Sequence, residues 1–277
     1  MPGTLVAEAV ARALAEDLGL AGDVTTNATI AADASSKGTI GSRADGVVAG
    51  IEVAREAFRQ VDPRIRFEAG IGDGATVGRG TTVAKLSGPS RGILSAERVA
   101  LNFLCHMSGI ATLTARYVEA AKGTGARICC TRKTNPGLRA FEKYAVRCGG
   151  GSSHRYGLFD AVLIKDNHIV AAGGVGKALT AARRSVGHLV KIEIEVDSIK
   201  QIPAALDGGA DVVMLDNMKP AELEKAVALI AGRALAEASG GVNLDTVRAI
   251  AESGVDLISV GALTHSAPVL DLGLDFS

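Results

Sequence analysis

The sequence predicts an α/β protein in two parts, a mixed N-terminal unit followed by a series of alternating strands and helices. Two observations lead to this prediction. In the first hundred residues, short alternating runs are separated by closely spaced glycines, whereas from about residue 110 β-rich runs alternate with helical stretches. The chain has 277 residues, enough for one large domain or two smaller ones. Repeated βα units are typical of a buried parallel sheet, either doubly wound or closed into a barrel.

The composition excludes several classes of protein. Hydrophobic residues make up 47% of the chain, too many for a disordered chain. No apolar stretch of about 18 residues is free of charge and glycine, so we expect no membrane span. Lys plus Arg and Asp plus Glu are equal at 30 each, so net charge does not indicate a nucleic acid partner.

The N-terminal segment and the cysteines predict a cytoplasmic protein. The first helix has acidic residues among apolar ones and lacks the basic region and cleavage site of a secretion signal. The four cysteines form no C-x-x-C pair, and Cys129 and Cys130 are neighbours in an apolar run, as expected of reduced, buried thiols. The five histidines lack metal-ligand spacing, so we expect no zinc.

The N-terminal part is predicted to be an α+β unit. Its expected elements, in chain order, are a helix at 4–18, a turn at 22–26, a strand-like segment at 38–50, a helix at 51–61, short strands within 64–70 and 72–88, and a helix from Ser95. Asp62-Pro63 should end the helix at 51–61, because proline cannot continue it. The glycines between the strands favour a hairpin or a small sandwich. Ser95 is suited to cap the helix that continues through ERVALNFLCHM.

The C-terminal part is predicted to be an array of βα units. Its β-rich runs are at 126–132, 160–166, 190–197, 211–217, 234–240 and 256–262, and helical patterns lie at 198–209, 220–232 and 243–254. Each run ends in a polar residue or glycine, at intervals of 21 to 33 residues: Arg132, Lys165, Glu195, Asp216, Ser239 and Gly261. This pattern favours a barrel, because the carboxyl ends of barrel strands converge on one mouth.

The run at 190–197 alternates charged and apolar residues. Its charged face carries Lys191, Glu193, Glu195 and Asp197. If helices cover the outside of the sheet, this face points into the barrel, where charges persist only when paired or bound to a ligand. The alternative is an exposed edge strand with one solvated face.

Basic residues are concentrated between 127 and 168, where the sequence has eight Lys and Arg but only three acidic residues. This stretch includes the glycine-rich segment CGGGSSHRYG. This excess favours an anionic small molecule, because arginine holds carboxylate or phosphate with two hydrogen bonds. We expect functional roles for the three at strand ends: Arg132, Lys133 and Lys165. We expect the three on the helical segment LRAFEKYAVR to be surface residues: Arg139, Lys143 and Arg147.

Glycine loops follow the last two predicted strands, at 239–241 and 261–262, and each precedes a helical segment. Barrels commonly bind phosphate there through backbone N–H groups. Glu195 and Asp216 end neighbouring strands and are suited to hold Mg²⁺ directly or through water, to balance Lys133 and Lys165, or to do both.

The block TRKTNPGLRAFEKYAVRCGGGSSHRYGLFDAVLIKDNH at 131–168 resembles the signature region of quinolinate phosphoribosyltransferases, the decarboxylating nicotinate-nucleotide pyrophosphorylases. The resemblance continues through EDLGLAGDVTT (16–26), SAERVALNFLCHMSGIAT (95–112), EIEVD (193–197), LDN (215–217), SGG (239–241) and VGALTHS (260–266). It implies an N-terminal α/β sandwich at 1–109, an incomplete, about seven-stranded α/β barrel at 110–266, and a tail, 267–277, that returns to the first domain. It also implies a homodimer and leaves any larger assembly open.

The resemblance implies roles for individual residues. Four would surround the pyridine dicarboxylate: Arg132, His154, Arg155 and Lys165. Arg98 would complete the neighbouring subunit's site. Thr131 and Lys133 would lie near the substrate phosphates, with Glu195 and Asp216 on the ribose and Mg²⁺ side. The 5′-phosphate cradle would consist of Ser239, Gly240, Gly241, Val260, Gly261 and Ala262. The catalytic residues would be Lys133, Lys165, Glu195 and Asp216.

One position departs from the family. Cys130 stands where an acidic residue is common, which puts the orientation of Arg132 in doubt. The implied reaction joins quinolinate to phosphoribosyl pyrophosphate and releases nicotinate mononucleotide, pyrophosphate and CO₂, in de novo NAD biosynthesis. Three alternatives stay open: a lyase or isomerase with Lys165 as a Schiff-base amine, a non-catalytic nucleotide sensor, and a transferase that acts on another acid.

Overall fold

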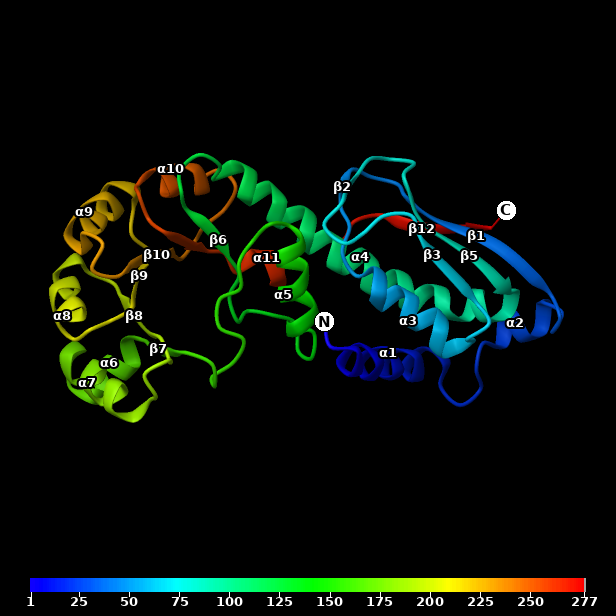
Figure 1. The fold of residues 1–277 in the computed structure, drawn as a ribbon, viewed down its shortest axis with the longest axis horizontal. Coiled ribbons are helices and arrows are strands. Elements are labelled where there is room, and N and C mark those ends of the chain that lie inside the picture. Colours follow the sequence, from blue (N-terminus) through cyan, green and yellow to red (C-terminus); the bar gives the residue numbers. More distant parts are fainter. Residues whose placement is uncertain (277) are drawn as a thin grey trace. The chain divides into compact units, whose positions relative to one another are not determined.

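The computed structural model describes residues 1–276, which form two compact units (Figure 1). Unit 1 comprises Met1–Leu113, Ala140–Gly150 and the C-terminal residues from Ser266. Unit 2 comprises Thr114–Arg139 and Gly151–His265. The division between Leu113 and Thr114 falls inside one long helix, α4 (Ser90–Ala120). None of the helices in residues 1–276 is both long and apolar enough to cross a membrane.

Unit 1 contains a four-stranded antiparallel sheet in the order β12-β1-β5-β3. Its strands are β1 (Ser35–Ser42), β3 (Arg66–Ala69), β5 (Thr82–Pro89) and β12 (Leu272–Phe276). A separate two-stranded ladder joins β2 (Gly46–Val47) to β4 (Thr76–Val77). The C-terminal β12 pairs with β1, so that Gly38 lies opposite Phe276. Helices α1 (Gly3–Leu18) and α3 (Ile51–Val61) lie on one side of the sheet (Figure 1).

Helix α3 shows how local sequence produces this unit. Its apolar residues are buried, and the Phe58 ring lies 5.9 Å from the Phe67 ring of β3. Asp73 Oδ1 accepts hydrogen bonds from the first backbone N–H groups of the helix, at Gly50 and Ile51. The helix ends at Val61, before Asp62-Pro63, as predicted.

Three local predictions in unit 1 were wrong. The segment predicted as a turn is helix α2 (Val24–Thr29), because Asp23 accepts a hydrogen bond from Thr26 N and caps it. Helix α4 begins at Ser90, and Ser95 Oγ instead donates to Asp23 Oδ2 at 3.0 Å. On α5 (Arg139–Cys148), Lys143 is completely buried rather than on the surface.

Unit 2 contains a six-stranded parallel sheet in the order β6-β11-β10-β9-β8-β7. The strands are β6 (Arg127–Cys129), β7 (Val162–Ile164), β8 (Ile192–Val196), β9 (Val212–Asp216), β10 (Leu235–Ser239) and β11 (Leu257–Ser259). Figure 1 shows helices on the outer side of these strands: α6 (Asp166–Ala172), α7 (Val175–Ser185), α8 (Ile202–Asp207), α9 (Pro220–Ile230) and α10 (Val247–Glu252). The predicted α/β class is confirmed, with a parallel array typical of an incomplete barrel.

The sheet has six strands rather than about seven. Beside β6, the position of a further strand is taken by Ser152, which forms an isolated parallel bridge with Cys129. Ser152 N donates to Ile128 O at 2.8 Å, and Cys130 N donates to Ser152 O at 3.1 Å. Three glycines precede Ser152, and glycine weakens extended strands, which explains why pairing stops at one residue.

The prediction for the charged face of β8 holds for two of its four residues: Glu193 and Glu195 lie within the covered strand, whereas Lys191 and Asp197 lie just outside it and are exposed. Ile192, Ile194 and Val196 are buried on one face, and Glu193 is only 6% exposed on the other. Lys191 lies just before the strand, where its Nζ donates to Asp211 Oδ1. The alternative of an exposed edge strand is therefore excluded, because β8 lies between β7 and β9.

Candidate active site

A cavity of about 550 Å³ opens at the carboxyl ends of the parallel strands of unit 2. Eleven of the predicted site residues line it: Thr131, Arg132, Lys133, His154, Arg155, Lys165, Glu195, Asp216, Ser239, Gly240 and Gly241. The sheet register explains why residues so far apart in sequence meet, since Ser239 lies opposite Asp216 and Glu195 lies opposite Met214.

Lys165 and Glu195 form an ion pair at the cavity mouth. Lys165 Nζ donates to Glu195 Oε2 at 2.5 Å, and the Glu195 side chain is 15% exposed. The backbone N–H of Lys165 donates to His168 Nδ1 at 2.9 Å, so the KDNH motif fixes the turn from β7 into α6.

Arg132 and Arg155 supply a positively charged wall. Both side chains are half-buried, and the Nε atom of each is buried with no hydrogen-bond partner among residues 1–276. Burial lowers the pKa of Arg155, and the nearby charge of Arg132 lowers it further. Arg155 Nη1 donates to Ala161 O at 3.2 Å, but a buried Nε–H without a partner is costly, so this wall favours an anionic ligand that accepts hydrogen bonds from both arginines.

An acidic cluster lies deeper in the cavity. His154 Nε2 lies 2.7 Å from Glu193 Oε2 and 3.7 Å from Glu237 Oε1. Both carboxyl groups are buried, and burial together with the charge of Glu193 raises the pKa of Glu237 to about 7. One ligand atom from each residue lies within 4.8 Å of the others, a metal-like grouping that the sequence did not predict.

The first glycine of the loop after β10 leaves no room for a side chain. Gly240 has φ 92°, and a Cβ there would lie 2.1 Å from Asn217 Oδ1. Asn217 N donates to Ser239 O at 2.9 Å, which ties the ends of β9 and β10 together. Gly241 has φ 62° and open space around its Cα, so the backbone here is accessible to a ligand.

Four predicted site residues do not line the cavity: Arg98, Val260, Gly261 and Ala262. Gly261 nevertheless packs against a lining residue, because a Cβ there would meet Lys133 Cδ at 3.1 Å. The following residues fix the same lysine, since Thr264 Oγ1 donates to Lys133 O at 2.7 Å. Arg98 belongs to unit 1 and is exposed on α4.

The sequence analysis missed five lining residues: Leu163, Met214, Asn217, Glu237 and Ser259. Glu237 had a signal, because it is the one charged residue in the apolar run ALAEAS. Asn217 directly follows Asp216 and has a left-handed φ of 55°, a conformation that hydrophobic periodicity does not predict. The surface expectation for Arg139 was also wrong, because its guanidinium donates to Thr134 Oγ1 and Tyr156 O, whereas Arg147 is exposed as expected.

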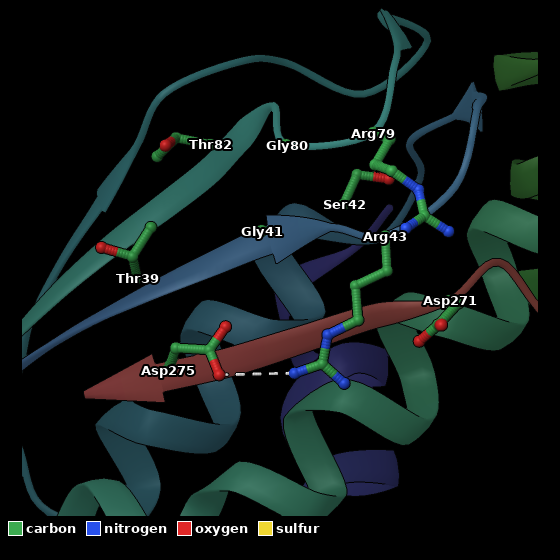
Figure 2. Close-up of a pocket in the computed structure, with 9 residues that line it drawn as sticks. All are labelled: Thr39, Gly41, Ser42, Arg43, Arg79, Gly80, Thr82, Asp271 and Asp275. Atoms are coloured by element: carbon green, nitrogen blue, oxygen red, sulfur yellow. Dashed lines mark hydrogen bonds and ion pairs between the residues drawn. The ribbon is translucent and has the colours of Figure 1, made fainter. Parts of the chain in front are cut away.

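Unit 1 has a separate hollow of about 510 Å³ over β1, β5 and β12 (Figure 2). Figure 2 shows Arg43 reaching along β12 toward Asp275, with Nη2 and Oδ1 3.4 Å apart. Both side chains are more than half exposed, and exposed pairs of this kind contribute little. Two arginines are balanced by two aspartates in this lining, so its charge does not select an anion.

Comparison with known proteins gives a consistent result. Two family models match nearly the whole chain, the quinolinate phosphoribosyl transferase N-terminal domain over residues 23–108 and its C-terminal domain over 110–275. The chain is 44% identical over 275 residues to the nicotinate-nucleotide pyrophosphorylase [carboxylating] of Mycobacterium leprae, covering 97% of this chain and 96% of that protein. It is 41% identical over 260 residues to the probable nicotinate-nucleotide pyrophosphorylase [carboxylating] of Bacillus subtilis, covering 94% and 89%.

Solved structures agree with this relationship. The crystal structure of NadC from Streptococcus pyogenes superposes with a TM-score of 0.95 at 40% identity, covering 100% of this chain and 99% of that one. The nicotinate-nucleotide pyrophosphorylase of Francisella tularensis gives a TM-score of 0.96 at 38% identity, covering 100% and 98%.

Proposed function

The chain belongs to the quinolinate phosphoribosyltransferase family, and we propose that the cavity at the carboxyl ends of its parallel strands is the site of the family's reaction. The enzyme joins quinolinate to phosphoribosyl pyrophosphate and releases nicotinate mononucleotide, pyrophosphate and CO₂, a step of de novo NAD biosynthesis. The observation that carries the site assignment is the pair of buried guanidinium Nε atoms, of Arg132 and Arg155, that lack partners in this cavity.

We assign quinolinate to the basic wall. Arg132, Lys165 and the adjacent pair His154 and Arg155 line the cavity from three segments of the chain. A dicarboxylate accepts hydrogen bonds from guanidinium forks and an ammonium group, which satisfies the donors left unpaired in the protein. These cations also offset the repulsion between a dianionic acid and a polyphosphate, which would otherwise disfavour the ternary complex.

We assign the phosphoribosyl group to the glycine-loop side. The accessible backbone at Gly241, the neighbouring lining residue Gly240 and the Ser239 hydroxyl suit the 5′-phosphate. Thr131 and Lys133 suit the pyrophosphate, and the segment 260–262 supports Lys133 from behind through the contact at Gly261. Lys133 is exposed and can neutralise charge that grows on the leaving group.

We propose Mg²⁺ as the cofactor, held by Glu195 and Asp216 directly or through water. Carboxylate oxygens at the ends of adjacent strands are the ligand type that Mg²⁺ prefers when substrate phosphates complete its shell. When bound, Mg²⁺ supplies positive charge for the pyrophosphate. The Lys165–Glu195 and Asn217–Asp216 contacts keep these carboxylates aligned in the protein alone.

The chemistry follows from this arrangement. The pyridine nitrogen attacks the anomeric carbon as pyrophosphate leaves, and Glu195 and Asp216 orient the ribose hydroxyls and stabilise positive charge on the sugar. The new bond makes the ring cationic, so that the C–CO₂ bond can break and leave its electron pair beside N⁺. A proton then adds to that carbon. We assign to Lys165 the binding of the departing carboxylate and the donation of this proton.

We further propose that the enzyme is a cytoplasmic homodimer in which Arg98 completes the neighbouring subunit's site. The exposed position of Arg98 on α4 and its match to the family motif ERVALN support this assignment. The four cysteines form no disulfide with one another and two of them are buried, which is consistent with a reducing compartment. The Lys165 amine is engaged in a contact with Glu195, which argues against a Schiff-base mechanism, in which this nitrogen attacks a carbonyl carbon.

Lysine substitutions test the site assignment. Arg132→Lys and Arg155→Lys keep the charge and remove the two-pronged hydrogen bonding, so each should raise the Kd for quinolinate at least tenfold in calorimetry. Arg147→Lys, on the exposed side of α5, is the matched control and should bind as the wild type does. Unchanged affinity in both cavity variants would refute the assignment of quinolinate to this wall.

A further inference from the structure

Two buried glutamates at the base of the cavity have no part in the mechanism described so far. Glu193 comes from β8 and Glu237 from β10, and the two are 6% and 2% exposed. Both approach His154, from the segment before β7. Two carboxyl groups and one imidazole thus share a space that water hardly reaches.

The hydrogen bonds in this space are incomplete. Glu193 Oε2 lies 2.7 Å from His154 Nε2, so that a proton on Nε2 is donated to the carboxylate. The other oxygen of Glu193 and Oε1 of Glu237 are buried without any hydrogen-bond partner among residues 1–276. Two ionised carboxylates this close together, with buried oxygens that accept no hydrogen bond, are strongly disfavoured. Binding of one proton to the pair removes the repulsion between the two charges.

The surroundings decide which group holds that proton. The groups facing Glu237 are Glu193 from β8, His154, Cys129 from β6 and Ser259 from β11. Burial raises the pKa of Cys129 to about 12, so this thiol adds no charge. Burial and the charge of Glu193 raise the pKa of Glu237 to about 7, and His154 opposes this only in part.

We propose that Glu193 is a positioning residue for the acid substrate, which orients His154 through its Nε2–H, and that Glu237 stands beside the pair as a neutral carboxylic acid. The inference rests on the proposed function, because His154 is assigned to the quinolinate side of the cavity. Glu193 fixes the tautomer and the ring plane of His154, as carboxylates do for histidines in other sites. A neutral Glu237 avoids a second negative charge under a dianionic ligand.

A metal ion is the competing occupant, since the three ligand atoms lie within 4.8 Å of one another. The 2.7 Å separation of His154 Nε2 and Glu193 Oε2 favours a proton instead. Ligands of a tetrahedral zinc at about 2.0–2.1 Å lie about 3.3 Å apart. The spacing is that of a hydrogen bond.

Isosteric amides distinguish the two glutamates. Glu193→Gln replaces the acceptor of the Nε2 proton by a group that can donate, so the KM for quinolinate should rise by about 10- to 100-fold. The KM for phosphoribosyl pyrophosphate should change less than twofold. Glu237→Gln mimics the neutral acid and should leave both KM values within about threefold of wild type at pH 6.5.

The pH profile provides a readout that a purely structural role would not change. In the wild type, Glu237 is neutral below pH 7 and ionises above it, so the KM for quinolinate should rise between pH 7 and 9. Glu237→Gln should lack this component, and the difference between the two profiles isolates Glu237. Thermal unfolding of both variants checks that they are folded.

Several outcomes would overturn the inference. The first two are an unchanged KM for quinolinate in Glu193→Gln and a wild-type pH profile in Glu237→Gln. The third is that both variants raise both KM values and also lower the Tm. The fourth is stoichiometric zinc or manganese in the purified wild type that is lost in Glu237→Gln. A wild-type enzyme that does not turn over quinolinate would refute the proposed function as well. Any of the former results with normal wild-type turnover would refute this inference alone.

Discussion

Lys165 Nζ and Glu195 Oε2 lie 2.5 Å apart and join the carboxyl ends of β7 and β8 across the mouth of the cavity. The pair places an ammonium group on the side of the site assigned to quinolinate and a carboxylate on the side assigned to the ribose. Each group orients the other before any substrate binds. We therefore expect replacement of either residue to impair the enzyme.

Lys165→Met should reduce kcat/KM for quinolinate by about 10- to 160-fold, because it removes a charged donor worth about 1.5–3 kcal/mol and leaves Glu195 without its partner. Lys225→Met, at an exposed position of α9, is the control and should retain wild-type kinetics. Borohydride added during turnover should not change the mass of the wild-type protein. A covalent adduct at Lys165 would instead support the Schiff-base alternative.

Glu195→Gln and Asp216→Asn should each shift the Mg²⁺ dependence of activity to at least tenfold higher concentration, because an amide oxygen attracts a cation less than a carboxylate does. Magnesium titrations at fixed substrate measure the shift. Glu224→Gln on the exposed face of α9 tests for a general effect of lost charge. If the cavity variants and this control have the same titration midpoint, neither carboxylate holds the metal.

Arg98→Ala should abolish most activity by weakening quinolinate binding. If Arg98 acts across a dimer interface, mixing this variant with Lys133→Ala should restore activity, since one site of each mixed dimer has both residues intact. Activity should approach a quarter of the wild-type value in an equimolar mixture with random exchange, as one dimer in two is mixed and has one intact site. No recovery, once exchange is verified by mass spectrometry, would show that Arg98 does not serve a neighbour's site.

Gly240→Ala should raise the KM for phosphoribosyl pyrophosphate at least tenfold, because its Cβ would lie 2.1 Å from Asn217 Oδ1 and displace the loop. Gly232→Ala separates this clash from backbone strain. Gly232 has a similar positive φ of 73° but open space, so its substitution should cost about 1–2 kcal/mol of stability and leave that KM unchanged. Equal KM values in both variants would exclude the loop from substrate binding.

The strand ends of unit 2 could be predicted from sequence because buried parallel strands are apolar and their last residues are polar. Arg132, Lys165, Glu195 and Asp216 stood out for this reason, and all four line the cavity. The start of α4 could not be predicted, because the SGPS segment looks like a turn although proline is also common at helix starts.

Buried charges were the least predictable feature. Glu142 is completely buried and its Oε1 lies 3.0 Å from His106 Nε2, 36 residues away in the sequence. Glu237 likewise faces His154 from a distant strand. A single sequence contains no local signal for such partners, because the partner that stabilises a buried charge is set by the fold. For the same reason Lys143 was expected on the surface with the other basic residues of LRAFEKYAVR, whereas the structure buries it completely.

The most direct test of the account is a coupled assay of the purified protein with phosphoribosyl pyrophosphate and Mg²⁺, supplied in parallel with quinolinate or with nicotinate, that follows both pyrophosphate and CO₂. The account predicts stoichiometric release of both products with quinolinate and release of neither with nicotinate. Pyrophosphate without CO₂, or turnover with nicotinate alone, would contradict it.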